Sequence, residues 1–186
     1  MTKKKSRKGI CITLACIAAF LVICGRYVVP SVLYPLKYRE YVEKYSAEYN
    51  LDKELVFAII KTESSFKTEA VSGKGAIGLM QIMEPTAEWI VDHSHIEAEK
   101  WEYAEPDVNI HMGCWYLNYL INYFHDEDLA LAAYNAGMGN VENWLKDENY
   151  SADGLSLEEI PFKETREYVK KVESAERIYE VLYFTE

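Results

Sequence analysis

Apolar residues recur at intervals of three and four along most of the chain after Leu36, which is the spacing of amphipathic helices. Between residues 38 and 49, for example, tyrosines and a valine form one helical face, and charged residues occupy much of the rest. Alternating apolar and polar positions, which are typical of strands, are nearly absent. The sequence therefore predicts a mostly α fold.

Residues that favour helix ends divide this pattern into separate elements. The expected helix starts are Asp52, Pro85, Asp107, Asp128 and Asn140. We expect Gly137 to end the helix that Asp128 begins, because glycine accepts the backbone angles found after a helix. Residues 78–83 can form another short helix, and the last helix is predicted from Glu164 to about Tyr183.

The pattern is different near the N-terminus. Residues 10–25 contain no charged side chain and follow a basic cluster within residues 3–8. This predicts a transmembrane anchor over residues 9–29 after a short basic cytoplasmic tail, residues 1–8. No pair of small residues closes the apolar run, so we favour an uncleaved anchor over a cleaved signal peptide. The basic cluster is expected to stay in the cytoplasm, which places the domain of residues 36–186 outside the cell membrane.

Charge is unevenly distributed along the chain. Residues 27–186 hold 14 of the 20 basic residues and all 30 acidic residues, which gives this part a net charge of −16. A domain this acidic repels phosphate backbones. We therefore expect no nucleic-acid partner.

The cysteines and histidines do not predict a redox or metal centre. Three of the four cysteines lie in the apolar N-terminal run, so no disulfide is expected within the domain, and Cys114 is expected to be a buried small residue. His93 and His95 are two residues apart, a spacing that places them on different faces of a helix, and no cluster of cysteines or acids accompanies them in the sequence. We therefore expect no metal site and no organic cofactor.

One glutamate continues the apolar face of the helix predicted over residues 53–66. Glu63 follows Ile59 and Ile60 by four and three positions, and a glycine-rich segment, SGKGAIGLMQIM, comes after Phe66. Small residues there would let a substrate approach the backbone closely beside the carboxyl group. The spacing alone also fits a solvent-exposed carboxylate at a helix end followed by ordinary turns, and it leaves both interpretations open.

Four short motifs follow one another in the chain. They are ES at residues 63–64, SGKGAIGLMQ at 72–81, AYNAG at 133–137 and ETREYV at 164–169. In this order they resemble the lysozyme-like catalytic domain of the soluble lytic transglycosylase family, bacterial enzymes that cleave peptidoglycan. The resemblance extends from about Tyr41 to Tyr179, and the segment NIHMGCWYL, residues 109–117, is similar to the family pattern between the second and third motifs. One departure is that Pro85 follows Glu84, whereas the family usually has proline directly after GLMQIM.

The resemblance implies a reaction and a set of residues for it. The family cleaves the β-1,4 bond between N-acetylmuramic acid and N-acetylglucosamine without water and forms 1,6-anhydromuramic acid. Glu63 would act first as the acid and then as the base. Apolar neighbours are expected to raise the pKa of Glu63 and keep its carboxyl group protonated for the first step. The residues implied to bind the substrate or to hold Glu63 in place are Ser72, Gln81, Tyr134, Asn135 and Tyr168.

Two alternatives to this reaction remain open. A muramidase of similar fold would hydrolyse the same bond with water, and a second acid such as Asp107 or Asp126 near the cleft would favour it. A membrane-tethered module could also bind the cell wall without turnover. Such a module would need the groove but not the acid, so the presence of Glu63 beside the other motifs favours an enzyme.

Overall fold

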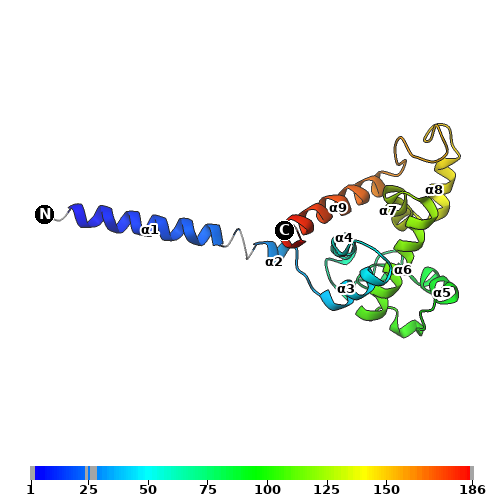
Figure 1. Cartoon of the computed structure of the whole chain (residues 1–186), viewed down its shortest axis with the longest axis horizontal. Helices are drawn as coiled ribbons and strands as arrows, with labels where there is room; N and C mark the ends of the chain where they lie inside the picture. Colours follow the sequence, from blue (N-terminus) through cyan, green and yellow to red (C-terminus); the bar gives the residue numbers. More distant parts are fainter. Residues whose placement is uncertain (1–2, 24, 26–28, 185–186) are drawn as a thin grey trace. The chain divides into compact units, whose positions relative to one another are not determined.

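The computed structural model describes residues 3–23, 25 and 29–184, and the chain divides into two compact units, Met1–Lys37 and Tyr38–Glu186. The first unit contains the helices α1 (Lys3–Ile23) and α2 (Val29–Leu33) (Figure 1). Among the residues described, no helix has both the length and the apolar character needed to cross a membrane. The anchor predicted over residues 9–29 also includes residues 24 and 26–28, which lie outside the described residues.

The second unit is mostly helical, which confirms the predicted fold class (Figure 1). Its elements are α3 (Arg39–Glu48), α4 (Lys53–Ser64), β1 (Ala76–Ile77), β2 (Ile82–Met83), α5 (Glu84–His93), the short 3₁₀ helix η2 (Lys100–Glu102), α6 (Pro106–Phe124), α7 (Glu127–Ala136), α8 (Met138–Leu145), α9 (Lys163–Tyr179) and the π-helical turn η3 (Glu180–Phe184). The two strands form a small antiparallel pair in which Ile77 lies opposite Ile82.

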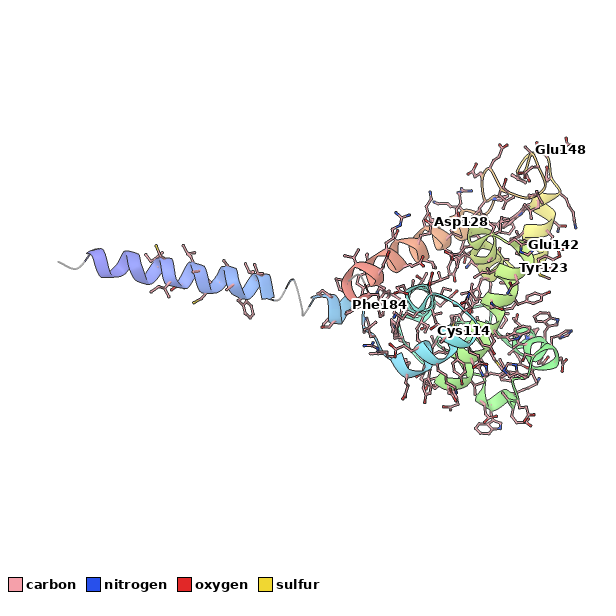
Figure 2. All side chains as sticks on the ribbon, viewed as in Figure 1. Cys114, Tyr123, Asp128, Glu142, Glu148 and Phe184 are labelled. Carbon is pink, nitrogen blue, oxygen red and sulfur yellow. The ribbon has the colours of Figure 1, made fainter. Side chains whose placement is uncertain are left out.

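Helix α4 lies in the core of this unit. Every residue from Leu55 to Ile60 is at most 1% exposed, so α4 is buried on all sides over this stretch. It packs mainly against α9, where the Phe57 ring stacks on Tyr179 with ring centroids 5.4 Å apart. Helix α6 also contributes to the core through Cys114, which is fully buried, as the sequence predicts (Figure 2).

Of the predicted starts of α4, α5 and α7, the first two are confirmed and the third is wrong. Asp52 is the residue before α4 and Pro85 lies in the first turn of α5, as predicted, although the Asp52 side chain makes no capping hydrogen bond. The prediction for α7 is wrong, because Asp126 caps this helix by accepting a 2.8 Å hydrogen bond from the Leu129 backbone N–H, and Asp128 lies inside the first turn. Gly137 ends α7 with φ +90°, which confirms its predicted role.

Asp107 and Asn140 are also not helix caps. Helix α6 begins one residue earlier, at Pro106, and the carboxylate of Asp107 accepts a 2.6 Å hydrogen bond from the Tyr45 hydroxyl on α3. Helix α8 begins at Met138, directly after Gly137, so Asn140 lies within its first turn. The Asn140 side-chain amide donates a 2.8 Å hydrogen bond to the carbonyl oxygen of Ala136, four residues earlier.

The short helix predicted at residues 78–83 is not present. Gly78 and Gln81 have φ values of +79° and +49°, which no right-handed helix can include. The residues between them form a tight turn, and Ile82 and Met83 pair with β1 as a strand. The segment is therefore a short hairpin that leads into α5.

Candidate active site

Glu63 lies at the C-terminal end of α4, where this buried helix reaches the edge of the core. Ile59 and Ile60, one turn earlier, are fully buried, and Glu63 itself is largely enclosed. Directly after the helix, Ser65 and Phe66 both have positive φ values, of 51° and 63°. Because such backbone angles are unusual for residues other than glycine, the chain turns sharply here at a conformational cost, and the turn fixes the end of α4.

Burial changes the acidity of this carboxyl group. Removal of the carboxylate from water raises the pKa of Glu63 from 4.5 to about 7, and an interaction with Tyr168 opposes this change to a smaller extent. The carboxyl group is therefore partly protonated near neutral pH. A group in this state can both donate and accept a proton under physiological conditions.

Two tyrosines from different helices face Glu63. The described residues include one buried side-chain polar atom that makes no hydrogen bond, the hydroxyl oxygen of Tyr168 on α9. It interacts with Glu63 closely enough to affect the pKa of that carboxyl group, although the geometry is not that of a regular hydrogen bond. Burial and then the charge of Glu63 raise the pKa values of both Tyr168 and Tyr134, so both phenols stay neutral beside it.

Tyr134, on α7, also fixes the glycine-rich hairpin. Its hydroxyl donates a 2.9 Å hydrogen bond to the backbone carbonyl oxygen of Met80. Its ring contacts that of Tyr116, with centroids 5.6 Å apart. Tyr134 therefore holds Met80 of the hairpin by a hydrogen bond and also lies near Glu63.

Ser72 and Gln81 hold the hairpin in shape through their side chains. The hydroxyl oxygen of Ser72 accepts hydrogen bonds from the backbone N–H groups of Ala76, at 2.9 Å, and Lys74. The side-chain amide nitrogen of Gln81 donates to the carbonyl oxygens of Ala70 and Gly78. These contacts engage the Ser72 oxygen and the Gln81 nitrogen but neither the Ser72 hydroxyl hydrogen nor the Gln81 side-chain oxygen.

Asn135 joins α7 to α9. Its side-chain oxygen accepts a 2.9 Å hydrogen bond from the hydroxyl of Thr165, which is only 2% exposed. Of the five residues implied to bind the substrate or to hold Glu63 in place, Tyr134 and Tyr168 are close enough for the charge of Glu63 to raise their pKa values. Among the residues described, no hydrogen bond joins Ser72, Gln81 or Asn135 to Glu63.

Asn109 is a site residue that has no predicted role from the sequence. This fully buried residue of α6 accepts a 2.7 Å hydrogen bond from the Met80 backbone N–H and donates to the carbonyl oxygens of Ile77 and Tyr103. A Cβ atom at Gly78 would lie 2.5 Å from its side chain, so only glycine fits there. The sequence contains one indication that Asn109 matters. Its Asn-Ile pair is part of the NIHMGCWYL segment, which is similar to the family pattern.

An apolar hollow lies beside this group of residues. It has a volume of about 260 Å³ and lies between α5, α6 and α8. Its lining residues are Pro85, Thr86, Trp89, Tyr116, Tyr119 and Met138. Because Tyr116 contacts Tyr134, the hollow is connected through two aromatic rings to the surroundings of Glu63.

Comparisons with known proteins identify the family of this domain. A family model described as "Transglycosylase SLT domain" matches residues 40–155. The chain is 36% identical over 150 residues to a soluble lytic murein transglycosylase of Salmonella typhimurium, and the match covers 78% of this chain and 23% of that protein. It is 31% identical over 169 residues to a membrane-bound lytic murein transglycosylase C of Serratia proteamaculans, covering 77% and 46% of the two chains.

A solved structure shows the same fold. The X-ray structure of an inactive mutant of the lytic transglycosylase Slt from Pseudomonas aeruginosa matches with a TM-score of 0.72 and 35% identity, over 82% of this chain and 25% of that chain. The chain thus spans less than half the length of these relatives, whereas the family model covers more than half of this chain. The chain belongs to the transglycosylase SLT domain family.

Proposed function

We propose that this chain is a peptidoglycan lytic transglycosylase that cleaves the β-1,4 bond between N-acetylmuramic acid and N-acetylglucosamine. The observation that carries the proposal is the buried carboxyl group of Glu63, whose pKa is raised to about 7 beside two neutral tyrosines. Peptidoglycan as the substrate is supported by the relatives, which are named lytic murein transglycosylases. No metal or organic cofactor is needed for this chemistry.

One carboxyl group can carry out both proton transfers of the reaction. Protonated Glu63 donates its proton to the glycosidic oxygen as the bond from that oxygen to C1 of the muramic acid breaks. The resulting carboxylate then accepts the proton of the 6-hydroxyl group, whose oxygen forms a new bond to C1. The products are a free 4-hydroxyl group and a 1,6-anhydro end, and Glu63 is protonated again. The acetamido group of the substrate can stabilise C1, so no second protein carboxylate is required.

Tyr168 is proposed as a positioning residue for Glu63. Its hydroxyl is buried and lacks a regular hydrogen bond, and it interacts with the carboxyl group. Hydrogen bonds at active sites are often long without substrate and shorten when the substrate is bound. We propose that the hydroxyl of Tyr168 donates to Glu63 once Glu63 has become a carboxylate.

Four further residues are proposed to bind the glycan. Ser72 can donate its hydroxyl hydrogen and Gln81 can accept with its side-chain oxygen, because their contacts within the protein leave these atoms available. Asn135 accepts from Thr165 through its oxygen, so its amide nitrogen can donate to a sugar. Tyr134 would contact the sugar mainly with its ring, because its hydroxyl donates a hydrogen bond to the Met80 carbonyl oxygen.

The N-terminal segment is proposed to attach the enzyme to the cell membrane. Residues 10–25 carry no charge, and apolar side chains of α1 such as Ile12 and Phe20 are each 65% exposed, which favours a lipid environment for them. With residues 9–29 as an anchor, the basic N-terminus would lie in the cytoplasm and the catalytic domain outside. Extraction of membranes with carbonate tests this, because an anchored chain stays in the pellet.

A muramidase and an idle binding module are less well supported. Asp107 and Asp126, the acids considered for a muramidase, are engaged with the Tyr45 hydroxyl and the Leu129 backbone N–H. Among the described residues, no hydrogen bond or ion pair joins either carboxylate to Glu63, Tyr134 or Tyr168. A module without turnover would not need the costly burial of Glu63.

Mass spectrometry of muropeptides tests the proposal. Purified peptidoglycan would be incubated with the full chain in detergent, with the Glu63→Gln variant and with Glu69→Gln, a matched change at an exposed glutamate. Products lighter by one water than reducing-end products are expected from the wild type and from Glu69→Gln, and none from Glu63→Gln. Reducing-end products would identify a muramidase, and the absence of any product would favour the binding module.

A further inference from the structure

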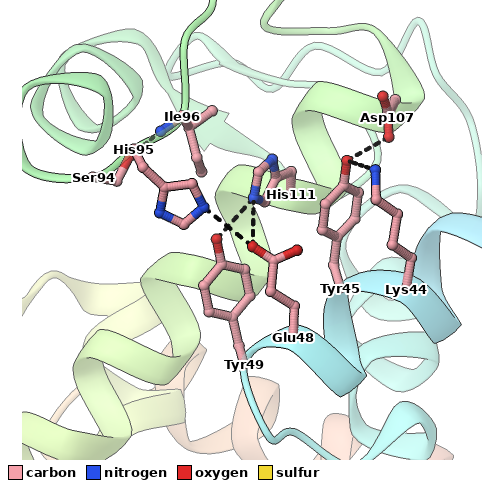
Figure 3. Close-up of polar contacts among 9 residues, drawn as sticks. All are labelled: Lys44, Tyr45, Glu48, Tyr49, Ser94, His95, Ile96, Asp107 and His111. Carbon is pink, nitrogen blue, oxygen red and sulfur yellow. Dashed lines mark hydrogen bonds and ion pairs between the residues drawn. The ribbon is translucent and has the colours of Figure 1, made fainter.

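Three side chains from separate parts of the second unit meet at one point on its surface. Glu48 lies at the end of α3, His95 in the loop after α5, and His111 in α6 (Figure 3). Each offers one ligand atom, and these atoms lie within 4.8 Å of one another. Sequence spacing draws attention to His93 and His95, which are two residues apart. It cannot show that His95 meets Glu48 and His111, which are distant from it in the sequence.

Two of the three ligand-atom distances in this cluster are close to those around a zinc ion, and the third is at most 4.8 Å. The Glu48 Oε1 atom lies 3.1 Å from His95 Nε2 and 3.5 Å from His111 Nε2. In a tetrahedral site with metal–ligand bonds of about 2.0 to 2.1 Å, two ligand atoms are separated by about 3.3 Å. One carboxylate and two imidazoles are also a donor set that zinc commonly has in proteins.

The most enclosed ligand, His111, is held in place by stacking. Its ring lies 4.0 Å from that of Tyr45 with an interplanar angle of 12°, and the Tyr45 hydroxyl is in turn fixed by Asp107 and Lys44 (Figure 3). The Tyr49 hydroxyl lies 2.8 Å from His111 Nε2, the same nitrogen that faces Glu48, so a bound ion would replace this hydrogen bond. The stacking on Tyr45 therefore orients the ring before an ion binds.

The other two ligands can be reached from solvent. The side chain of His95 is 68% exposed and that of Glu48 is 36% exposed, whereas that of His111 is 16% exposed. An ion can therefore enter from the side of His95, whose exposed ring has room to rotate toward it. The nearby cation Lys44 is engaged with the Tyr45 hydroxyl.

We propose that Glu48, His95 and His111 form a binding site for one Zn²⁺ ion, with water in the fourth position. The ion would join α3, the loop after α5 and α6, and it would act as a structural clamp. Helix α6 also carries Asn109, which holds the glycine-rich hairpin through Met80, so the clamp would stabilise the helix that supports the proposed active site. The proposal does not depend on the reaction, because its test measures metal binding.

Titration calorimetry and thermal unfolding test the site. The full chain, without a histidine tag, would be stripped of metal with a chelator and titrated with ZnCl₂ at pH 7 in a detergent and a buffer that do not bind zinc. One zinc ion per chain is expected. At a zinc concentration a hundredfold above the dissociation constant, the melting temperature should rise by about 5 to 10 °C. Calcium, which prefers oxygen ligands, should produce no such rise.

A matched pair of variants assigns the binding to this cluster. His95→Gln removes an exposed ligand and should weaken zinc binding about tenfold or more, whereas His93→Gln, two residues earlier and outside the cluster, should leave it unchanged. Glu48→Gln should also weaken binding. Failure of the wild type to bind zinc would overturn the proposal and leave the three side chains as a hydrogen-bonded ion-pair network. Equal zinc affinity in His95→Gln and the wild type would overturn it as well.

Discussion

Glu63 and Glu176 have similar acidities but lie in different surroundings at the two ends of the α4–α9 pair. The pKa of each is raised to about 7, and in each case burial is the largest cause. At Glu63 the second influence on the pKa is the Tyr168 hydroxyl, which lowers it. At Glu176 the remaining contributions come from like charges, which raise it, and these belong to Glu127, Asp52, Glu54 and Glu180.

The comparison shows that a raised pKa does not identify a catalytic acid by itself. Glu176 belongs to an acidic surface group, where its proton relieves repulsion between carboxylates. Glu63 is flanked by phenols that can hold it, and it belongs to the first of four motifs typical of the family. The surroundings of Glu63 combine a partly protonated acid with groups proposed to bind a sugar, and for this reason Glu63, not Glu176, is the proposed catalytic acid.

The largest expected difference between the two glutamates is in turnover. Glu63→Gln should lower the rate of glycan cleavage by about 10²- to 10⁴-fold, because it removes the only group proposed to transfer protons. Glu176→Gln should leave the rate within about twofold of the wild type, since it alters no group near the reaction. Release of muropeptides measured by chromatography checks both. Equal losses of cleavage rate in the two variants would contradict the proposal that Glu63, and not Glu176, transfers the protons.

The next effect concerns stability and its dependence on pH. Because the pKa of Glu63 is about 7 in the folded protein and 4.5 ordinarily, folding loses stability as the pH rises from about 4.5 to 7. A glutamine side chain at this position cannot ionise, so Glu63→Gln should be more stable than the wild type by about 2 to 3 kcal/mol at pH 8 and nearly equal to it at pH 4. Urea unfolding at the two pH values measures this. A difference that does not depend on pH would contradict the account.

A smaller effect is expected at Tyr168. Because its hydroxyl lowers the pKa of Glu63, Tyr168→Phe should move the loss of activity with rising pH to higher pH. Turnover should fall by about tenfold through weaker positioning of the carboxylate. Stability should be unchanged or higher, because the substitution removes a buried hydroxyl that has no hydrogen bond. An unchanged pH profile would mean that Tyr168 has only a packing role.

The smallest effect distinguishes the two causes of a raised carboxyl pKa, burial and the repulsion between like charges. Glu176→Gln should stabilise the protein at pH 8 by about 1 kcal/mol or less, since its group is partly exposed to solvent. Added salt screens the surrounding like charges, so this gain should decrease in 0.5 M NaCl (about 4 Å screening length). The gain in Glu63→Gln should change little, because burial is its cause. Unfolding at low and high salt compares the two, and equal salt dependence would contradict the assignment of causes.

Much of this site could be predicted from the order of residues, because it depends on local spacing. Glu63 continues the apolar face that Ile59 and Ile60 indicate, and the folded chain encloses most of its side chain, one of the two outcomes that the spacing left open. Gly137 ends α7 because glycine accepts the required angles. Such features depend on residues a few positions apart, which sequence patterns describe well.

Other features depend on contacts between distant residues. Asp126 and Asp128 have the same chemistry, and only the folded backbone determines that Asp126 meets the Leu129 N–H. Asn109 gains its role from Met80, which lies 29 positions away, and Glu48 meets His95 across 47 positions. No periodic pattern indicates contacts at such separations, so spacing predicts neither the contact between Asn109 and Met80 nor the proposed zinc site.

Direct titration of Glu63 tests the central claim, that burial makes this carboxyl group the acid of the reaction. The full chain would carry ¹³C-labelled glutamate, and the signal absent from Glu63→Gln would assign the carboxyl carbon. Its chemical shift, followed by NMR as the pH changes, should titrate with a midpoint near 7. A midpoint near 4.5 would show that Glu63 is an ordinary ionised carboxylate at neutral pH and would contradict the account.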